Sequence, residues 1–167
     1  MLRLRRRARL RRHEVEELCA GLRDHFGADA FAGIEAVDSG EVSDDVTVFL
    51  VGGEILALRA KGKATLTVRG LLRWPATRRW VTVDMGAVPY VYNGADVMAP
   101  GIVDADRAIA AGDPVWIRDE KNLRPLAVGE ALMPGPEMAV SEKGKAVRSV
   151  QHVGDDYWKY GEEGEKA

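Results

Sequence analysis

The sequence is poor in the residues on which several classes of protein depend. It has one cysteine, Cys19, in 167 residues, so no disulfide can form within the chain and a reducing, cytoplasmic location is expected. Uninterrupted apolar runs are only a few residues long, so no membrane-spanning helix is expected. The N-terminal leucines are separated by arginines, unlike the core of a signal peptide. Asn and Gln together occur three times, a scarcity typical of thermophilic proteins.

Patterns that carry catalysis or bind metals are also lacking. His13, Cys19 and His25 follow one another at intervals of six residues on one expected helix. Because each residue turns a helix by ~100°, successive members of this set point apart and cannot share a metal. The serines lack a nucleophile elbow, no phosphate-binding or dinucleotide fingerprint occurs, and His152 is expected on an exposed strand. We therefore expect no enzyme activity, no metal and no cofactor.

Positive charge is unevenly distributed along the chain. Residues 1–80 hold fifteen Lys and Arg against eleven Asp and Glu, whereas residues 81–167 hold nine against fifteen. This change of sign suggests two units with different surfaces, with a boundary near WPATRRW at 74–80. No Lys or Arg occurs between Arg79 and Arg107, and the segment MGAVPYVYNGADVMAPG, residues 85–101, carries three glycines and a single charge, Asp96.

The N-terminus holds seven arginines between Arg3 and Arg12. Residues 2–11 alternate in a way that predicts a strand with one buried face and one solvated face that carries a row of arginines, comprising Arg3, Arg5, Arg7 and Arg9. Two interpretations remain open at this point. The row either protects the edge of a sheet by its charge or contacts phosphate groups.

The remainder of the first half is typical of a small α+β domain. A helix is expected from His13 to Gly27, with Val15, Leu18, Leu22 and Phe26 on its buried face. A second short helix is expected over 29–36. Two β-branched runs flank Gly52–Gly53 and predict a hairpin, and LTVRGLLRW predicts a short helix that Pro75 stops.

The second half is typical of a small barrel of short strands. Strands are expected at WVTVD (80–84), ADVMA (95–99), DPVWIRD, RPLAVGEALM, KAVRSVQHV and DYWKY, with a two-turn helix over Gly86–Tyr92 that Asn93–Gly94 ends. The tail, residues 161–167, has almost nothing to bury and is expected to be disordered.

The combination VDMGAVPYVYNGADVMAPGI, AGDPVWIRD, PLAVGEALM and GKAVRSVQHVGDDYW resembles the PUA domain, a pseudo-barrel that binds RNA. The hairpin VFLVGGEILALRA and the segment LTVRGLLRWP before it resemble the family of malignant T-cell-amplified sequence and translation machinery-associated proteins, in its archaeal form. The resemblance covers about residues 10–160. It implies an N-terminal α+β domain with an antiparallel sheet over 1–78, followed by a PUA pseudo-barrel over 79–160.

The resemblance also implies where RNA would bind. In PUA domains the helix after the first strand, the loop that follows it and a late strand form the RNA surface. By position these are, in this chain, Gly86, Ala87, Val88, Asn93, Gly94, Ala95, Pro100, Gly101, Lys145, Arg148 and His152, with Lys143 supplying further charge. Glycines let an RNA backbone approach closely; alternatively, they only satisfy tight turns in a barrel.

The resemblance implies a non-enzymatic protein that binds the tRNA acceptor end or rRNA in translation initiation, reinitiation or recycling. Its expected partners are the small ribosomal subunit and a separate translation factor, with no membrane. The arginine row would add RNA contacts. Two alternatives remain open: a protein-interaction scaffold with a PUA-like barrel, which the acidic second half favours, and an accessory subunit of an RNA-modification enzyme.

Overall fold

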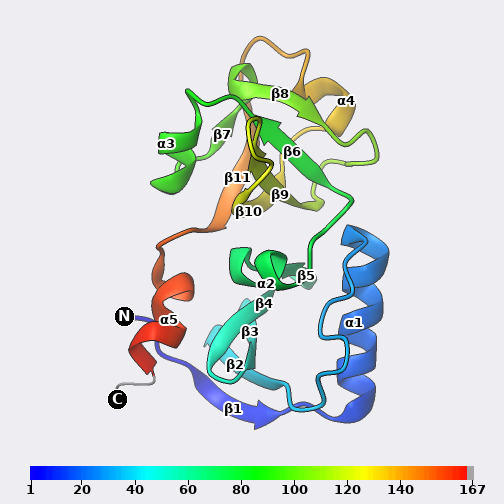
Figure 1. Ribbon diagram of the computed structural model, residues 1–167, viewed down its shortest axis with the longest axis vertical. Coiled ribbons are helices and arrows are strands. Elements are labelled where there is room, and N and C mark those ends of the chain that lie inside the picture. Colours follow the sequence, from blue (N-terminus) through cyan, green and yellow to red (C-terminus); the bar gives the residue numbers. More distant parts are fainter. Residues whose placement is uncertain (165–167) are drawn as a thin grey trace. The chain divides into compact units, whose positions relative to one another are not determined.

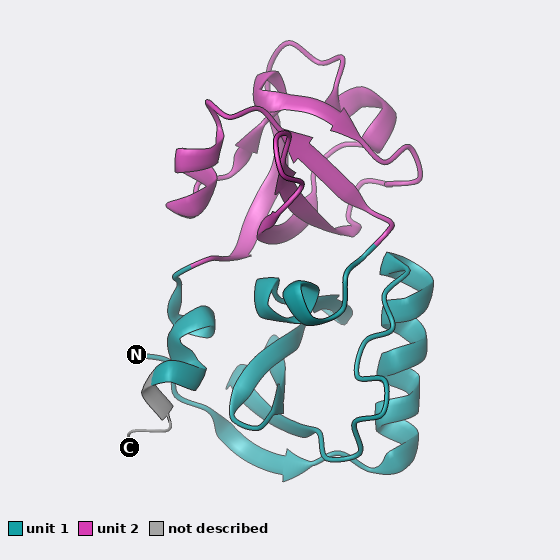
Figure 2. Ribbon diagram, viewed as in Figure 1, with its two compact units in different colours: residues 1–76, 154–167 teal, residues 77–153 magenta. Residues whose placement is uncertain are grey.

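The computed structural model describes residues 1–164 and divides the chain into two compact units. Residues 1–76 and 154–167 form the first unit, and residues 77–153 form the second (Figure 2). The chain therefore passes from one unit to the other twice. Residues 154–160, which the family resemblance placed in the second domain, belong to the first unit.

Within residues 1–164, the first unit contains one antiparallel sheet and three helices (Figure 1). Its strands follow chain order across the sheet, β1-β2-β3-β4-β5. The elements are β1 (Arg5–Arg9), α1 (Arg12–Phe26), β2 (Asp38–Ser43), β3 (Val46–Val51), β4 (Glu54–Ala60), β5 (Lys63–Leu66), α2 (Val68–Arg73) and α5 (Asp156–Gly164).

Helix α1 confirms the expected helix and its buried face. Val15, Leu18, Leu22 and Phe26 are all buried at helical spacing. Gly27 ends the helix in the left-handed region at φ 67°, where its N–H donates to the Arg23 carbonyl at 2.8 Å. The helix expected over 29–36 is wrong. Phe31 and Gly33 have φ of 59° and 74°, which no right-handed helix accommodates, and the segment forms turns.

The N-terminal strand departs from the predicted alternation because a β-bulge interrupts it. Arg5 lies opposite Glu41 and Ala8 opposite Ser39, so three steps on β1 match two on β2, and Arg6 has φ 51°. Arg9, opposite Asp38, therefore faces the other side of the sheet from Arg5. All five residues of β1 are exposed. The prediction of a single row of arginines on one face is wrong.

The hairpin and the short helix after it are confirmed. Gly52 and Gly53 both have positive φ, 57° and 84°, as a two-residue hairpin turn between β3 and β4 requires. Thr67 caps helix α2 by accepting the Gly70 N–H at 3.2 Å, and its hydroxyl donates to the Ile55 carbonyl at 2.9 Å. The bond to Ile55 joins the start of α2 to β4.

The segment DYWKY, expected as a strand, is the first part of helix α5. The Asp155 side chain accepts the Trp158 N–H at 2.9 Å, a capping bond that starts the helix. Arg69 of α2 holds α5 in place by stacking 4.0 Å from the Trp158 ring, donating to the Trp158 carbonyl and pairing with Glu162 at 2.9 Å. Residues 161–164 of the predicted tail are thus helical, and residues 165–167 lie outside the described residues.

The second unit is a strongly curved, nearly closed sheet of six strands, which confirms the predicted pseudo-barrel. Its strand order is β7-β11-β10-β9-β6-β8, with β6 and β9 parallel and the other pairs antiparallel. The elements are β6 (Trp80–Val83), α3 (Val88–Tyr92), β7 (Val97–Met98), a 3-10 turn η1 (Ala99–Gly101), β8 (Ile102–Ala105), β9 (Pro114–Asp119), β10 (Pro125–Ala131), α4 (Gly135–Met138) and β11 (Lys145–His152). Sixteen buried apolar side chains, including Val81, Ile117 and Val147, form its core.

Among the described helices, none is both long and apolar enough to cross a membrane. Nor do three or more His, Cys, Asp or Glu side chains gather within residues 1–164 in a way that could hold a metal ion.

Candidate nucleic-acid interface

Three segments from two distant stretches of the sequence meet at one side of the second unit. They are the turn and helix at 86–92, the loop at 93–101 and strand β11 (Figure 1). The loop runs antiparallel beside β11, with Val97 opposite Val147 and Met98 opposite Lys145. We call residues 86–101 together with β11 the α3–β11 surface. It contains every expected site residue of the second half.

The turn before α3 is held to the end of the loop by Asp84. Its Oδ1 accepts the Ala87 N–H at 2.9 Å, and its own N–H donates to the Gly101 carbonyl at 2.9 Å. A Cβ on Gly101 would lie 3.1 Å from the Ala87 Cβ. Gly101 therefore allows the two backbones to approach. Helix α3 itself begins at Val88, two residues later than predicted.

Gly94 is required by the backbone and by a neighbour. Its φ is +85°, and a Cβ there would lie 2.8 Å from Nε2 of His152. The Nδ1 atom of His152 lies 2.9 Å from the Val153 carbonyl oxygen, and because a carbonyl only accepts, Nδ1 carries the proton. Gly94 and His152 thus form one packed contact, which accounts for this glycine without any ligand.

Asp96, the one charge in the 85–101 segment, ties the loop to β11. Its Oδ1 accepts the Ser149 N–H at 2.9 Å, and its Oδ2 lies 3.3 Å from the Lys145 ammonium. The Ser149 hydrogen bond holds the pKa of Asp96 below its ordinary value; burial opposes this shift, and Lys145 and Arg148 support it. The carboxylate is therefore charged at neutral pH.

The cations of the α3–β11 surface are exposed but already paired. The Lys145 side chain is 61% exposed beside Asp96, and the Arg148 side chain is 42% exposed and lies 3.5 Å from Glu130. Lys143 is also exposed. A phosphate group could reach each of these ammonium or guanidinium groups from solvent.

A cavity of about 280 Å³ opens beside α3 within the α3–β11 surface. Apolar groups of Ala87, Tyr90, Met98 and Pro100 contribute to its lining. Tyr90 is 69% exposed and Met98 is 46% exposed. The charged side chains in the lining are two carboxylates, Asp84 and Asp96.

The PUA-domain family model matches residues 79–153. An uncharacterized protein of Methanocaldococcus jannaschii is 43% identical over 119 residues, which cover 71% of this chain and 74% of that protein. Translation machinery-associated protein 20 of Eremothecium gossypii is 27% identical over 124 residues, with 71% and 68% covered. A crystal structure of a hypothetical protein from Pyrococcus horikoshii superposes with a TM-score of 0.77 at 38% identity, over 92% of this chain and 98% of that one.

The chain belongs to the PUA-domain family of translation machinery-associated protein 20 and the malignant T-cell-amplified sequence proteins. The matched residues, 79–153, include the whole α3–β11 surface of the PUA unit.

The sequence pattern alone did not identify several residues that line the cavity beside α3. Asp84, Tyr90 and Met98 line the cavity, although none was among the expected site residues. Two tyrosines and two methionines within 85–98 are exposed and mark the site, but their exposure is known only from the structure. Arg3, Arg5, Arg7 and Arg9 lie in the first unit, where Arg5 pairs with Asp44 and both Arg7 and Arg9 pair with Asp38.

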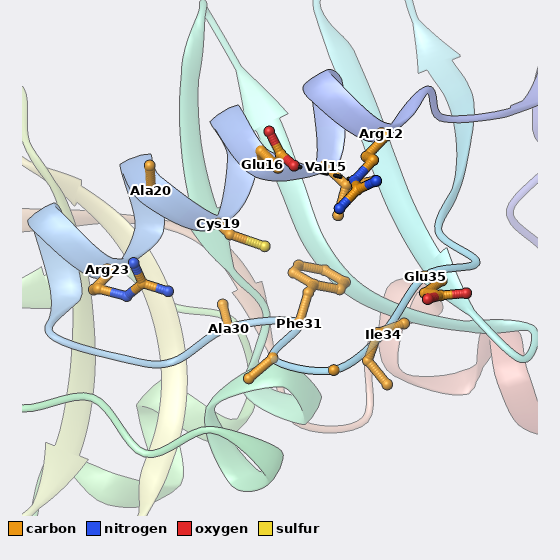
Figure 3. Close-up of a pocket in the computed structure, with 12 residues that line it drawn as sticks. Arg12, Val15, Glu16, Cys19, Ala20, Arg23, Ala30, Phe31, Ile34 and Glu35 are labelled. Carbon is orange, nitrogen blue, oxygen red and sulfur yellow. Dashed lines mark ion pairs between the residues drawn. The ribbon is translucent and has the colours of Figure 1, made fainter.

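The first unit has a larger cavity, of about 700 Å³, between α1 and the 30–35 segment (Figure 3). In Figure 3 the Cys19 thiol points at the Phe31 ring, with Arg12 and Arg23 toward opposite ends. Two glutamates balance the two arginines in the lining, and Arg12 pairs with Glu16 at 3.3 Å. Burial raises the pKa of the Cys19 thiol, so it stays protonated at neutral pH. This lining favours neither an anion nor a cation.

Proposed function

We propose that this protein binds RNA in translation through the α3–β11 surface, with the acceptor end of tRNA or a segment of rRNA as its target. The observation that carries the proposal is the PUA unit itself, which brings the loop without Lys or Arg, the cavity and the β11 cations to one surface. The name of the translation machinery-associated relatives supports a role in translation.

The chemistry of the surface suits an unpaired RNA end. Tyr90, Tyr92 and Met98 are exposed beside the cavity or on α3 and offer apolar area on which bases stack. Such stacking is worth about 1–3 kcal/mol per base. Phosphates would meet Lys143, Lys145 and Arg148 at the edge of the surface. Because Lys145 and Arg148 begin paired with carboxylates, phosphate exchanges with those acids instead of meeting free charge.

The N-terminal arginines are proposed to add affinity for phosphate that does not depend on sequence. Arg5, Arg7 and Arg9 are paired with acids of the first unit, but their side chains remain 47–63% exposed. Exposed ion pairs are worth about 0–1 kcal/mol, so a phosphate can displace the carboxylate at little cost. The small ribosomal subunit and a separate translation factor are proposed as further partners.

A steric block tests the proposal. Ala87 is unsuitable for it because this residue packs beside Gly101 and against the barrel core. Ala95 is exposed in the 93–101 loop, so Ala95→Trp adds bulk over the surface without filling the core. The matched control is Ala111→Trp, at an exposed position in the loop between β8 and β9 that does not line the cavity.

The measurement is fluorescence anisotropy of the full chain with two labelled hairpins, one with an unpaired 3′ tail and one blunt. We expect the tailed RNA to bind more tightly and its affinity to fall steeply with salt. Ala95→Trp should weaken it by about tenfold, which corresponds to ~1.4 kcal/mol, while Ala111→Trp should not. Absence of binding at low salt would refute RNA binding and favour a protein-interaction scaffold. Equal effects of the two tryptophans would place the RNA elsewhere.

A further inference from the structure

We propose that the outer face of strands β6 and β9 is a docking site for an acidic segment of a protein partner, one carboxylate of which pairs with Arg118. The face is formed by Trp80 and Thr82 of β6 and by Trp116 and Arg118 of β9, and we call these four residues the Trp–Arg face. It shares no residue with the α3–β11 surface, and this inference does not depend on the RNA binding proposed above.

The register of β6 and β9 brings these four side chains to one face of the barrel. The two strands are parallel, with Trp80 opposite Trp116 and Thr82 opposite Arg118. The residues that alternate with them, among them Ile117, belong to the buried core of the second unit. Because successive side chains of a strand point to opposite faces, the four residues point away from that core.

The Arg118 guanidinium is held in place by its neighbours on this face. Its Cζ atom lies 4.1 Å from the centre of the Trp80 ring and 5.5 Å from that of Trp116. Its Nε donates to the Thr82 hydroxyl at 2.9 Å. Trp116 is itself fixed, since it is only 4% exposed and its indole N–H donates to the Arg78 carbonyl at 2.9 Å. An arginine that is ordered in advance loses little conformational freedom when it pairs with an anion.

The two terminal nitrogens of Arg118 have no hydrogen-bond or ion-pair partner among residues 1–164, whereas Arg79, Arg107 and Arg148 of the same unit each pair with an acid. In the described part of the chain every fully buried side-chain nitrogen or oxygen has a partner, so these two nitrogens reach solvent. Partial burial lowers the pKa of Arg118, and the charge of Asp104 opposes that shift. Arg118 is thus a partly desolvated cation whose terminal donors await an acceptor.

The surroundings of Arg118 favour a single carboxylate over the backbone of a nucleic acid. Asp104 of β8 lies opposite Thr82, so a chain of phosphates that crosses this face would meet a like charge. The cation beside Asp104, Arg107, already lies 4.0 Å from that acid. Two parallel hydrogen bonds from a guanidinium match the geometry of a carboxylate.

The aromatic part of the face indicates what should flank that carboxylate. Trp80 is partly exposed beside Arg118 and offers apolar area to neighbouring residues of a partner. Tryptophan and arginine are also the residues that contribute most to the binding energy of protein interfaces. We therefore expect a segment in which Asp or Glu stands next to apolar side chains.

The test observes Arg118 by NMR in the full chain. Because the Arg118 Nε–H is bonded to Thr82, its resonance can be followed together with that of the Trp80 indole N–H. The probe is a labelled peptide in which aspartate alternates with leucine, and the control peptide has asparagine in place of aspartate. We expect both resonances to shift with the aspartate peptide, and fluorescence anisotropy to show about tenfold tighter binding than for the control peptide. Equal binding of the two peptides, failure of both to bind, or no shift at Arg118 would overturn the inference.

Variants separate this pairing from a general effect of charge. Arg118→Gln should weaken binding of the aspartate peptide about tenfold, and Arg118→Lys, which keeps the charge without the planar donors, nearly as much. The control Arg124→Gln removes the same charge from an exposed arginine that makes neither a ring contact nor an ion pair within residues 1–164, and should leave the affinity unchanged. Equal losses in Arg118→Gln and Arg124→Gln would refute the site. A loss for the tailed RNA hairpin in Arg118→Gln, without a loss for the peptide, would assign the face to RNA instead. Should the Arg118 variants not fold, the comparison of the two peptides on the unaltered protein decides.

Discussion

Removal of Asp96 should destabilise the PUA unit by an amount that its two contacts predict. The Ser149 N–H bond to a charged, partly buried acceptor is worth about 1.5–3 kcal/mol. The pair with Lys145 adds about 0–1 kcal/mol, because that lysine is 61% exposed. We therefore expect Asp96→Ala to lower the free energy of unfolding by about 1.5–4 kcal/mol. Asp96→Asn keeps an acceptor for Ser149 and should cost about half as much.

The pH dependence gives this prediction its sign. The pKa of Asp96 is lower in the folded chain than its ordinary value near 3.9, so the unfolded chain binds more protons at acidic pH. The stabilisation is fully present above about pH 5 and is lost as pH falls through the folded pKa. Urea unfolding of wild type and Asp96→Asn from pH 7 to pH 3 should show two curves that converge at low pH.

Two results would refute this account of Asp96. One is a constant difference between wild type and Asp96→Asn across the whole pH range, because a neutral residue cannot share the titration. The other is a double-mutant cycle with Lys145→Ala in which the coupling energy exceeds the Ser149 contribution. That result would mean that the exposed ion pair, and not the backbone hydrogen bond, holds the loop to β11.

Two further predictions concern the first unit. Gly70→Ala should destabilise it by about 1–3 kcal/mol in urea unfolding, because a Cβ there would overlap the Leu56 carbonyl oxygen of β4. The control Gly21→Ala lies on α1 with open space around the new methyl group and should stabilise the unit by about 0.5–1 kcal/mol. Equal effects of the two substitutions on the free energy of unfolding would contradict the packing of Gly70 against β4. Arg69→Ala should release α5, so hydrogen exchange in residues 156–162 should accelerate while β3 and β4 stay protected. Arg69→Lys keeps the charge without the planar stack and should give an intermediate exchange rate. Unchanged exchange in Arg69→Ala would show that other contacts hold α5.

The elements that local sequence determines were predictable. The buried stripe of α1 repeats at helical spacing, and Gly27 stops the helix because it tolerates positive φ. Gly52–Gly53 between two β-branched runs defines a hairpin for the same reason. The barrel was predictable as a class, because several short strands separated by turn residues have few other ways to bury their apolar faces.

The errors arose where a tertiary contact or an isolated backbone angle overrides the local pattern. DYWKY has the aromatic composition of a strand, but the Asp155 cap and the stacking of Arg69 on Trp158 stabilise a helix. The arginine strand alternates in sequence, yet one residue with positive φ, Arg6, moves Arg5 and Arg9 to opposite faces. The alternation of apolar and charged residues in a sequence does not reveal that one residue other than glycine adopts a left-handed backbone conformation.

The candidate site was predictable in its segments but not in its contacts. Glycines and prolines mark 86–101 as a loop-rich segment, and the family pattern points to β11 as its neighbour. The contacts that shape the site join residues about fifty positions apart, such as Asp96 with Ser149 and Gly94 with His152. These depend on the register between β7 and β11, in which Val97 lies opposite Val147. A shift of one residue would turn Lys145 to the other side of the strand.

Paired charges reconcile the acidic second half of the chain with the RNA binding we propose. Asp96 and Glu130 lie beside Lys145 and Arg148, so part of the negative charge of this half neutralises the cations of the surface itself. A phosphate that replaces one of these acids gains little net Coulomb energy, since one paired anion is exchanged for another. At this surface the affinity must therefore also come from groups other than the cations, among them the exposed Tyr90 and Met98 that line the cavity. The absence of Lys and Arg between Arg79 and Arg107 is compatible with the unpaired RNA end we propose, because a base is held by stacking and by hydrogen bonds to its edge.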